Sequence, residues 1–210
     1  MAHIHLEDGS FYLQWVIIWS VIALVIIGIC VLWLRRVRKI DSRVVTLAAL
    51  CTAATFAAFQ IEIPVFGGVH LSLTPLVGIL TGPAVGGIIV LIVNIFSAAI
   101  GHEGWGIIGA NSIVNMTEVV SAFGIYAWLN GRMKLKPLYS AGIATFVGLF
   151  LGNAAMIAII LVSGIQGKDV VLGDLSLIAA ANLVMAVLEA FVTAYIVAYI
   201  HKVRPDMLKA

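Results

Sequence analysis

Residues 11–39 have the sequence FYLQWVIIWSVIALVIIGICVLWLRRVRK, in which no residue from Phe11 to Leu34 is charged and a basic cluster follows. About 20 apolar residues suffice to cross the hydrocarbon core of a bilayer, and a basic cluster beside such a run marks its cytoplasmic end. The residues before Phe11 lack the basic segment with which signal peptides begin. We therefore predict that this run is a membrane span that the mature chain keeps.

The whole chain has the composition of this first run. Of its 210 residues, 62% are hydrophobic and 10% are charged, and the mean hydropathy is +1.14. Soluble domains contain about 45–50% apolar and about 25% charged residues, and a soluble fold of this length could not bury the surplus. Disordered chains are poor in apolar residues. The composition predicts an all-α, multi-pass protein of the cell membrane, formed by a single domain over residues 1–210: an N-terminal segment 1–10, a helical bundle 11–203 and a tail 204–210.

Seven helices are predicted from the apolar runs and the breaks between them. Pro64, Gly67 and Gly68 follow the second run and Gly82-Pro83 follows the third, and such residues do not continue a helix. The predicted helices span 11–34, 43–60, 70–80, 83–100, 109–130, 138–164 and 175–201. The third is too short to cross a bilayer, so we expect its neighbours to bury it.

The distribution of positive charge predicts the orientation of these helices. With the N-terminus outside the cell and the C-terminus in the cytoplasm, the inner segments are 35–43, the turn at Gly82-Pro83, 131–137 and the C-terminal tail. They hold every Lys and Arg of the chain except Lys168: Arg35, Arg36, Arg38, Lys39, Arg43, Arg132, Lys134, Lys136, Lys202, Arg204 and Lys209. Cytoplasmic loops are enriched in Lys and Arg, so the charges agree with seven helices in this orientation.

Histidine is concentrated on the opposite, outer side. His3 and His5 precede the first helix, His70 lies at the start of the third, and His102 precedes the fifth beside Glu103. Histidine is the commonest metal ligand in proteins. Four of the five histidines on one face indicate either a metal site or ordinary loop residues, and their positions alone leave both interpretations open.

Two predicted helices carry polar residues at helical spacing, which puts them on one face: Asn111, Asn115 and Glu118 on the fifth, and Asn182, Glu189 and Thr193 on the seventh. A carboxylate at the centre of a membrane helix costs about 2.5–3.5 kcal/mol. We therefore expect Glu118 and Glu189 to face the interior of the bundle. There they either line a transport pathway or hold helices together by hydrogen bonds.

Small residues recur every four positions in several predicted helices, a spacing that lets helices approach closely. The stripes are Ala49-Ala53-Ala57, Ala54-Ala58, Gly78-Gly82-Gly86 and Gly148-Gly152. The pattern does not distinguish packing within the bundle from contact with another subunit.

The N-terminus has the chemistry of a chelator. Ala2 is a small second residue, which normally permits removal of Met1, so the mature chain would begin Ala2-His3. The α-amine of Ala2, the deprotonated amide of His3 and the His3 imidazole supply three nearly coplanar nitrogens, and His70 would complete a square-planar set suited to Ni(II) or Cu(II). If Met1 is retained, the amine, two amides and the imidazole supply four nitrogens without His70.

An ordered series of short segments carries a family resemblance. They are His3-Ile4 with Glu7-Asp8-Gly9, Val69-His70-Leu71 with Thr74-Pro75-Leu76-Val77-Gly78 and Gly82-Pro83, Gly104-Trp105-Gly106-Ile107-Ile108-Gly109-Ala110-Asn111 with Asn115-Met116, and Glu189-Ala190-Phe191-Val192-Thr193 with Arg204-Pro205-Asp206-Met207-Leu208. Over nearly the whole chain they resemble the substrate-binding membrane subunit (S component) of the cobalt/nickel energy-coupling-factor transporters, the CbiM/NikM family.

The resemblance implies a site for a divalent cation at the outer mouth of the bundle. Its ligands would be the amine of Ala2, the amide and imidazole of His3, and His70. Family members have this histidine as the second encoded residue, so removal of Met1 would restore their spacing. The resemblance implies that Asn111 and Asn115 support the N-terminal loop. His5 departs from the family pattern and either lies near the site, captures the ion or is a plain surface residue, and His102 is a weaker candidate for the first two of these roles.

Energy for transport must come from other subunits, because the chain has no Gly-x-x-x-x-Gly-Lys-Ser/Thr motif. The resemblance implies a transmembrane coupling (T) subunit, two cytoplasmic ATP-binding cassette subunits and, in many members, a small accessory membrane subunit. It assigns Ala49, Ala53 and Ala57 to contact with the coupling subunit. We expect no enzymatic activity, no cofactor and no nucleic-acid partner, and the transported ion is Co²⁺ or Ni²⁺, which the sequence does not separate.

Two other classes compete with this interpretation. An intramembrane metalloprotease is disfavoured because His102-Glu103 is not followed by the second histidine of a His-Glu-x-x-His motif; position 106 is glycine. A proton-coupled carrier or channel that uses Glu118 and Glu189 is the remaining alternative. Such a transporter would depend on the two glutamates and not on His3.

Overall fold

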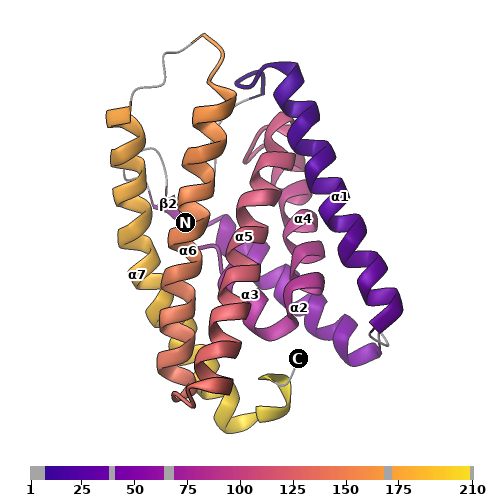
Figure 1. Ribbon diagram of the computed structural model, residues 1–210, viewed down its shortest axis with the longest axis vertical. Coiled ribbons are helices and arrows are strands. Elements are labelled where there is room, and N and C mark those ends of the chain that lie inside the picture. Colours follow the sequence, from indigo (N-terminus) through magenta and orange to yellow (C-terminus); the bar gives the residue numbers. More distant parts are fainter. Residues whose placement is uncertain (1–7, 38–40, 64–68, 168–171, 209–210) are drawn as a thin grey trace.

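The helices follow the apolar runs of the sequence. The computed structural model describes residues 8–37, 41–63, 69–167 and 172–208, and within these ranges it places seven α-helices and two strands of two residues each (Figure 1). The helices are α1 (Leu13–Val37), α2 (Ser42–Phe59), α3 (Thr74–Thr81), α4 (Pro83–Ala99), α5 (Ile108–Ala127), α6 (Pro137–Ser163) and α7 (Leu172–Val203). Five of the described helices are long and apolar enough to cross a membrane, and α4 is a shorter apolar helix. The prediction of an all-α, multi-pass membrane protein is confirmed.

The third helix begins later than the sequence predicts. Residue 70 is not helical: Val69–His70 form strand β2, which pairs antiparallel with strand β1 (Glu62–Ile63), and α3 starts only at Thr74. Leu73 turns the chain between strand and helix with a left-handed backbone, φ 56°. All eight residues of α3 are buried, which confirms the expectation that neighbouring helices enclose this short element.

Helix α5 is the centre of the bundle and packs against α1, α3, α4 and α6. Glycines make two of these contacts possible. A Cβ atom on Gly78 of α3 would lie 2.4 Å from the carbonyl oxygen of Val119 in α5, and a Cβ atom on Gly109 of α5 would lie 2.5 Å from the amide nitrogen of Ser20 in α1. A Cβ atom on Gly86 of α4 would also lie 2.7 Å from the Val119 side chain, so the glycine stripe that runs from Gly78 of α3 to Gly86 packs within the bundle.

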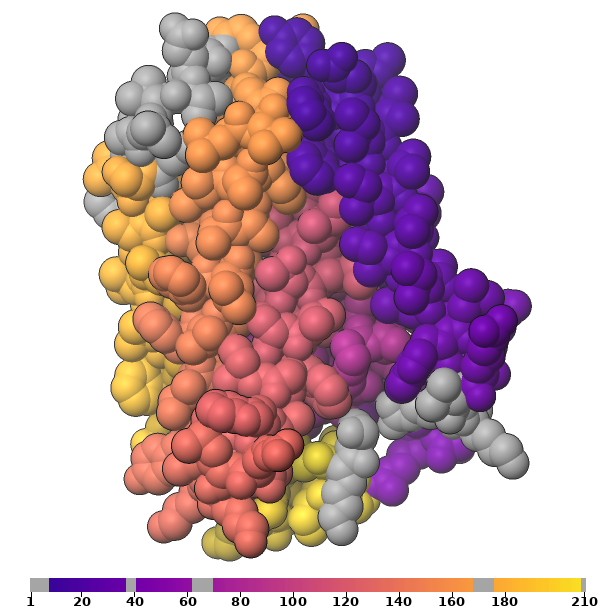
Figure 2. Space-filling view, in the orientation of Figure 1, coloured from indigo at the N-terminus to yellow at the C-terminus, as the bar shows by residue number. Residues whose placement is uncertain are grey.

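Helices α1 and α2 each have one face exposed on the surface of the bundle. On α2, the stripe Ala49-Ala53-Ala57 is exposed, whereas Thr55, Ala58 and Phe59 are buried. Helix α1 lies along one edge of the molecule, where Figure 2 shows it as an indigo column, and its outward side chains are apolar and exposed. These faces are open to lipid or to another protein.

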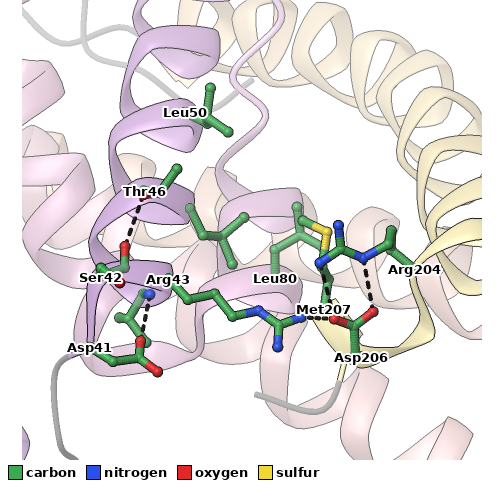
Figure 3. A pocket seen from close by; sticks show the side chains of 11 residues that line it. Asp41, Ser42, Arg43, Thr46, Leu50, Leu80, Arg204, Asp206 and Met207 are labelled. Atoms are coloured by element: carbon green, nitrogen blue, oxygen red, sulfur yellow. Dashed lines mark hydrogen bonds and ion pairs between the residues drawn. The ribbon is translucent and has the colours of Figure 1, made fainter.

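The C-terminal segment is linked to α2 by charge. Asp206 of the short helix η3 (Pro205–Leu208) forms an ion pair with Arg43 of α2 and accepts hydrogen bonds of 3.1 and 3.2 Å from Arg204. These residues line a cleft of about 560 Å³ between α2, the end of α3 and η3 (Figure 3). Two basic residues predicted to be cytoplasmic thus meet at one end of the bundle. Which way that end faces in the membrane stays a prediction.

Candidate metal site

Among the histidines that the structure describes, His70 is the buried one. It ends strand β2 with 1% of its surface exposed. Its ring contacts two aromatic neighbours from different segments: Phe59, at the end of α2, with centroids 5.4 Å apart and planes at 36°, and His102, with centroids 5.4 Å apart and planes at 54°. The fold therefore holds one predicted ligand in place and brings a second histidine from the outer cluster to its side.

The loop after His70 is held by Glu189 of α7. The Glu189 carboxylate accepts hydrogen bonds from the backbone N–H groups of Ser72 (3.0 Å) and Leu73 (2.8 Å) and from the Ser72 hydroxyl (2.8 Å). The left-handed turn at Leu73 lets two successive N–H groups reach one carboxylate, a recurring way to bind an anion. Glu189 is thus hydrogen-bonded to residues two and three positions along the chain from His70.

Glu118 of α5 holds the next residues of the same loop. Its carboxylate is hydrogen-bonded to the Thr74 hydroxyl, which lies 2.9 Å from the Ser72 hydroxyl. Gly152 of α6 leaves room for this carboxylate, because a Cβ atom there would lie 2.4 Å from the Glu118 Cγ. Both glutamates are fully buried. They connect the start of α3 to α5 and α7, so both face the interior as expected.

His102 lies in the loop between α4 and α5, and the next residue fixes that loop. The His102 amide donates to the Ser97 carbonyl at 3.0 Å, and Gly101 before it has φ +77°, a left-handed conformation that favours glycine. The Glu103 carboxylate, with 6% of the residue exposed, accepts a hydrogen bond from the Asn111 side chain of α5. Asn111 therefore positions the histidine loop.

Asn115 contacts a residue that sequence reasoning missed. Its amide donates to Asn94 of α4 at 3.0 Å, and Asn94 donates to the Ser112 hydroxyl at 3.1 Å. The sequence did contain a signal for this contact. Asn94 is the one amide side chain of a mostly apolar helix, and Asn side chains hydrogen-bond across membrane helices. Asn182 of α7 plays a similar part and donates to Asn153 of α6 at 3.2 Å.

The N-terminal segment is anchored beside the His102 loop. The Asp8 carboxylate accepts a hydrogen bond from the Gly106 amide (2.9 Å), and the Ser10 carbonyl accepts one from the Gln166 amide (2.7 Å). Phe11 is buried in a cluster with residues of α5 and α6. The predicted site residues Ala2, His3 and His5 lie outside the described residues.

The described side chains alone bring together two imidazoles rather than a complete ligand set. In the ranges that the structure covers, no three His, Cys, Asp or Glu side chains gather where they could hold a metal ion. His70 and His102 form the pair. Asp8, the first described residue, is hydrogen-bonded at the same end of the bundle, to Gly106.

Comparisons with known proteins identify a family and a shared fold. The family model described as "Cobalt uptake substrate-specific transmembrane region" (CbiM) matches residues 5–207. The cobalt transport protein CbiM of Sorangium cellulosum is 28% identical over 213 residues, which cover 97% of this chain and 94% of that protein. Two crystal structures share the fold: a transition metal transporter (TM-score 0.80, 18% identity, 95% and 93% of the two chains) and a truncated transition metal transporter (TM-score 0.82, 19% identity, 95% and 99%).

Proposed function

Because this chain belongs to the CbiM family of cobalt uptake substrate-specific transmembrane regions, we propose that it is the substrate-binding subunit of an energy-coupling-factor transporter that imports Co²⁺ or Ni²⁺. Its role as a transmembrane component of metal uptake follows from the family. The proposal adds the site of capture: the amine of Ala2, the amide and imidazole of His3, and the imidazole of His70.

The buried position of His70 carries this proposal. Its loop is fixed by three hydrogen bonds to Glu189, so its imidazole is preorganised before an ion arrives. The Asp8–Gly106 hydrogen bond holds the N-terminal segment against the loop that carries His102, the ring neighbour of His70. Five peptide units separate His3 from Asp8 and span at most about 17 Å when extended, so the proposal requires His70 to lie within that reach of Asp8.

Four nitrogen ligands define the chemistry of capture. An amine and an imidazole must lose their protons, and the amide must ionise, before they bind a metal, so binding releases protons and is weakened at low pH. Chelate rings at the N-terminus place three of the nitrogens in one plane. ATP hydrolysis belongs to the two cytoplasmic ATP-binding cassette subunits, and the exposed stripe Ala49-Ala53-Ala57 is the surface for the coupling subunit.

Metal titration of the purified full-length chain tests the ligand set. His3→Ala and His70→Ala are each expected to lower Co²⁺ and Ni²⁺ affinity by at least about tenfold. His201→Ala is the matched control, because His201 is an exposed histidine in the last turn of α7. Unchanged affinity in both His3→Ala and His70→Ala would contradict the site.

The state of the N-terminus is a second, independent test. Mass spectrometry of the intact protein is expected to show a chain that lacks Met1 and begins with a free Ala2 amine. A protein whose α-amine is blocked, yet which binds metal normally, would contradict the chelate. Metal import that continues in His3→Ala, and stops when Glu118 and Glu189 are both replaced by Gln, would instead favour a proton-coupled carrier.

A further inference from the structure

We propose that the cleft between α2 and η3 binds a phospholipid from the adjacent leaflet of the membrane, with its phosphate group held by Arg43 and Arg204. The cleft has a volume of about 560 Å³, which lies in the range of about 300–1,000 Å³ that is usual for small-molecule sites. It lies at the start of α2, whereas His70 contacts Phe59 at the end of the same helix. The lipid site is therefore separate from the metal site and independent of its ligands.

The length of α2 places the cleft at the surface of the membrane. This helix has 18 residues and is apolar enough to cross a membrane, and at 1.5 Å per residue it spans about 27 Å. The hydrocarbon core of a bilayer is about 30 Å thick. Because the helix is no longer than this core, its first residues, Ser42 and Arg43, reach the boundary where lipid phosphate groups begin.

Polar and apolar side chains line the cleft in the order in which a phospholipid presents its own groups. Ser42 and Arg43 begin the α2 wall, and Leu47 and Leu50 follow one and two turns farther along the helix. Figure 3 shows Arg43 reaching toward Asp206, with Leu50 farther along α2. Leu50 is exposed and lies about 10 Å from Arg43 along the helix axis. An acyl chain that starts from a phosphate at Arg43 would thus run over the leucines into the hydrocarbon.

Two guanidinium groups meet on one carboxylate in this cleft. Asp206 accepts hydrogen bonds from Nε and Nη2 of Arg204 and is paired with Nη2 of Arg43. One carboxylate neutralises one guanidinium, and a guanidinium has more N–H donors than these contacts use. The other acidic residue of the cleft, Asp41, caps α2 by accepting from the Val44 amide at 2.9 Å, where the positive end of the helix dipole partly offsets its charge. The arginine pair can therefore bind a phosphate group, the anion that guanidinium geometry suits.

The charge around the cleft favours an acidic lipid. Within the described ranges, eight basic and two acidic residues lie at this end of the bundle: Arg35, Arg36, Arg43, Arg132, Lys134, Lys136, Lys202 and Arg204, against Asp41 and Asp206. Basic segments beside a membrane attract anionic lipids. We therefore expect phosphatidylglycerol to bind more tightly than phosphatidylcholine, which has the same phosphate group but no net charge.

Native mass spectrometry of the full-length protein in detergent, with added phosphatidylglycerol, tests the proposal. The double variant Arg43→Gln/Arg204→Gln is expected to bind the lipid at least about tenfold more weakly, because charge-assisted hydrogen bonds to the phosphate are lost. Arg132→Gln/Lys202→Gln is the matched control, since it removes the same charge from exposed residues of the same end that do not line the cleft. The control is expected to change lipid affinity by less than about threefold, and equal losses in the two double variants would refute the site.

Asp206→Asn separates a lipid site from a purely structural ion pair. The Asp206 carboxylate competes with a phosphate for the two guanidinium groups, so its removal is expected to raise lipid affinity by up to about fivefold. If the two arginines and Asp206 served only to hold η3 against α2, Asp206→Asn would lower lipid binding as the arginine variant does. That result would overturn the inference.

Leu50→Asn and inorganic phosphate distinguish a lipid from a free phosphate ion. For a lipid, Leu50→Asn is expected to weaken phosphatidylglycerol binding by about threefold or more, because contact with the acyl chain is lost. Inorganic phosphate at the concentration of the lipid is then expected not to displace it. Displacement by inorganic phosphate, together with unchanged binding in Leu50→Asn, would show a site for the free ion and would contradict the proposal.

Discussion

The two buried glutamates bind the same loop, but their hydrogen-bond partners differ. Glu189 accepts from two backbone N–H groups and one hydroxyl. Replacing Glu189 by Gln puts an amide NH₂ opposite one of these N–H donors, which leaves a buried donor without an acceptor and costs about 1–3 kcal/mol. We expect Glu189→Gln to lower the free energy of unfolding in detergent by this amount and to weaken metal binding, because the loop positions His70.

Glu118 is expected to tolerate the same substitution. Three oxygen–oxygen contacts join Glu118 to Glu189 through Thr74 and Ser72, and the two hydroxyl groups supply two protons. Thr74 donates to Glu118 at one end of this chain and Ser72 donates to Glu189 at the other, and the side-chain oxygen of Gln at position 118 accepts the Thr74 proton as the carboxylate does. We predict a change in unfolding free energy within about 0.5 kcal/mol and continued metal import. A loss as large as that of Glu189→Gln would contradict this expectation.

Sequence reasoning placed His70 and His102 at one end of the bundle but did not find all their contacts. Their placement followed from the order of the helices, and their rings do lie together. The contact of Glu189 with Ser72 joins positions 117 residues apart. No local pattern encodes it, because it depends on how α7 packs beside β2. The ligands on residues 1–7 remain a prediction.

At the scale of helices, the contact between α1 and α5 depends on one missing side chain. A Cβ atom on Gly109 would lie within 2.7 Å of the α1 backbone at Trp19 and Ser20. We expect Gly109→Ala to separate the two helices and to destabilise the protein by about 1–3 kcal/mol, the usual cost of overpacking. Gly124→Ala is the control in the same helix, because no atom lies within 4 Å of its Cβ position. It is expected to be neutral or stabilising by up to about 1 kcal/mol, and unfolding titrations in detergent compare the two.

The alanine face of α2 gives a prediction about assembly. Ala53→Leu adds a bulky side chain to an exposed position, so the isolated chain is expected to fold and bind metal as before. Purification together with the coupling subunit, and metal import in cells, are expected to fail because the added side chain blocks close approach of another helix. Ala154→Leu places the same change on an exposed position of α6 and is expected to leave assembly intact. Equal behaviour of the two variants would contradict docking at α2.

Helices were more predictable than their packing partners. The seven apolar runs and the glycine and proline breaks between them gave the seven helices, with ends that differ by a few residues. The predicted start of the third helix at residue 70 was wrong. The pairing of β2 with β1 and the turn at Leu73 override the apolar pattern after His70. The alanine stripe of α2 and the glycine stripe of α3 have the same four-residue spacing, and the structure separates them: one is exposed and the other faces α5.

For the whole molecule, the orientation in the membrane is open to direct measurement. In a variant without Cys30 and Cys51, a cysteine at Gln166 is expected to react with a membrane-impermeant thiol reagent in intact cells. A cysteine at Arg132 is expected to react only after the cells are opened, because positive loops face the cytoplasm. Both positions are exposed. The reverse pattern would contradict an outer N-terminus and would move the histidines to the cytoplasmic side.

The ion pair between Arg43 and Asp206 stabilises its part of the molecule much less than buried hydrogen bonds stabilise the loop of His70. Exposed ion pairs contribute about 0–1 kcal/mol, and this pair, between side chains about half exposed, holds the N-terminal end of α2 to the end of the chain. The loop of His70 is held by buried hydrogen bonds to a carboxylate, each worth about 1.5–3 kcal/mol. A partner that docks on α2 therefore meets its weakest attachment at the Arg43 end, where a small force separates the helix from Asp206. The other end of α2 contacts the His70 ring through Phe59, so a larger displacement of the helix would reach the histidine.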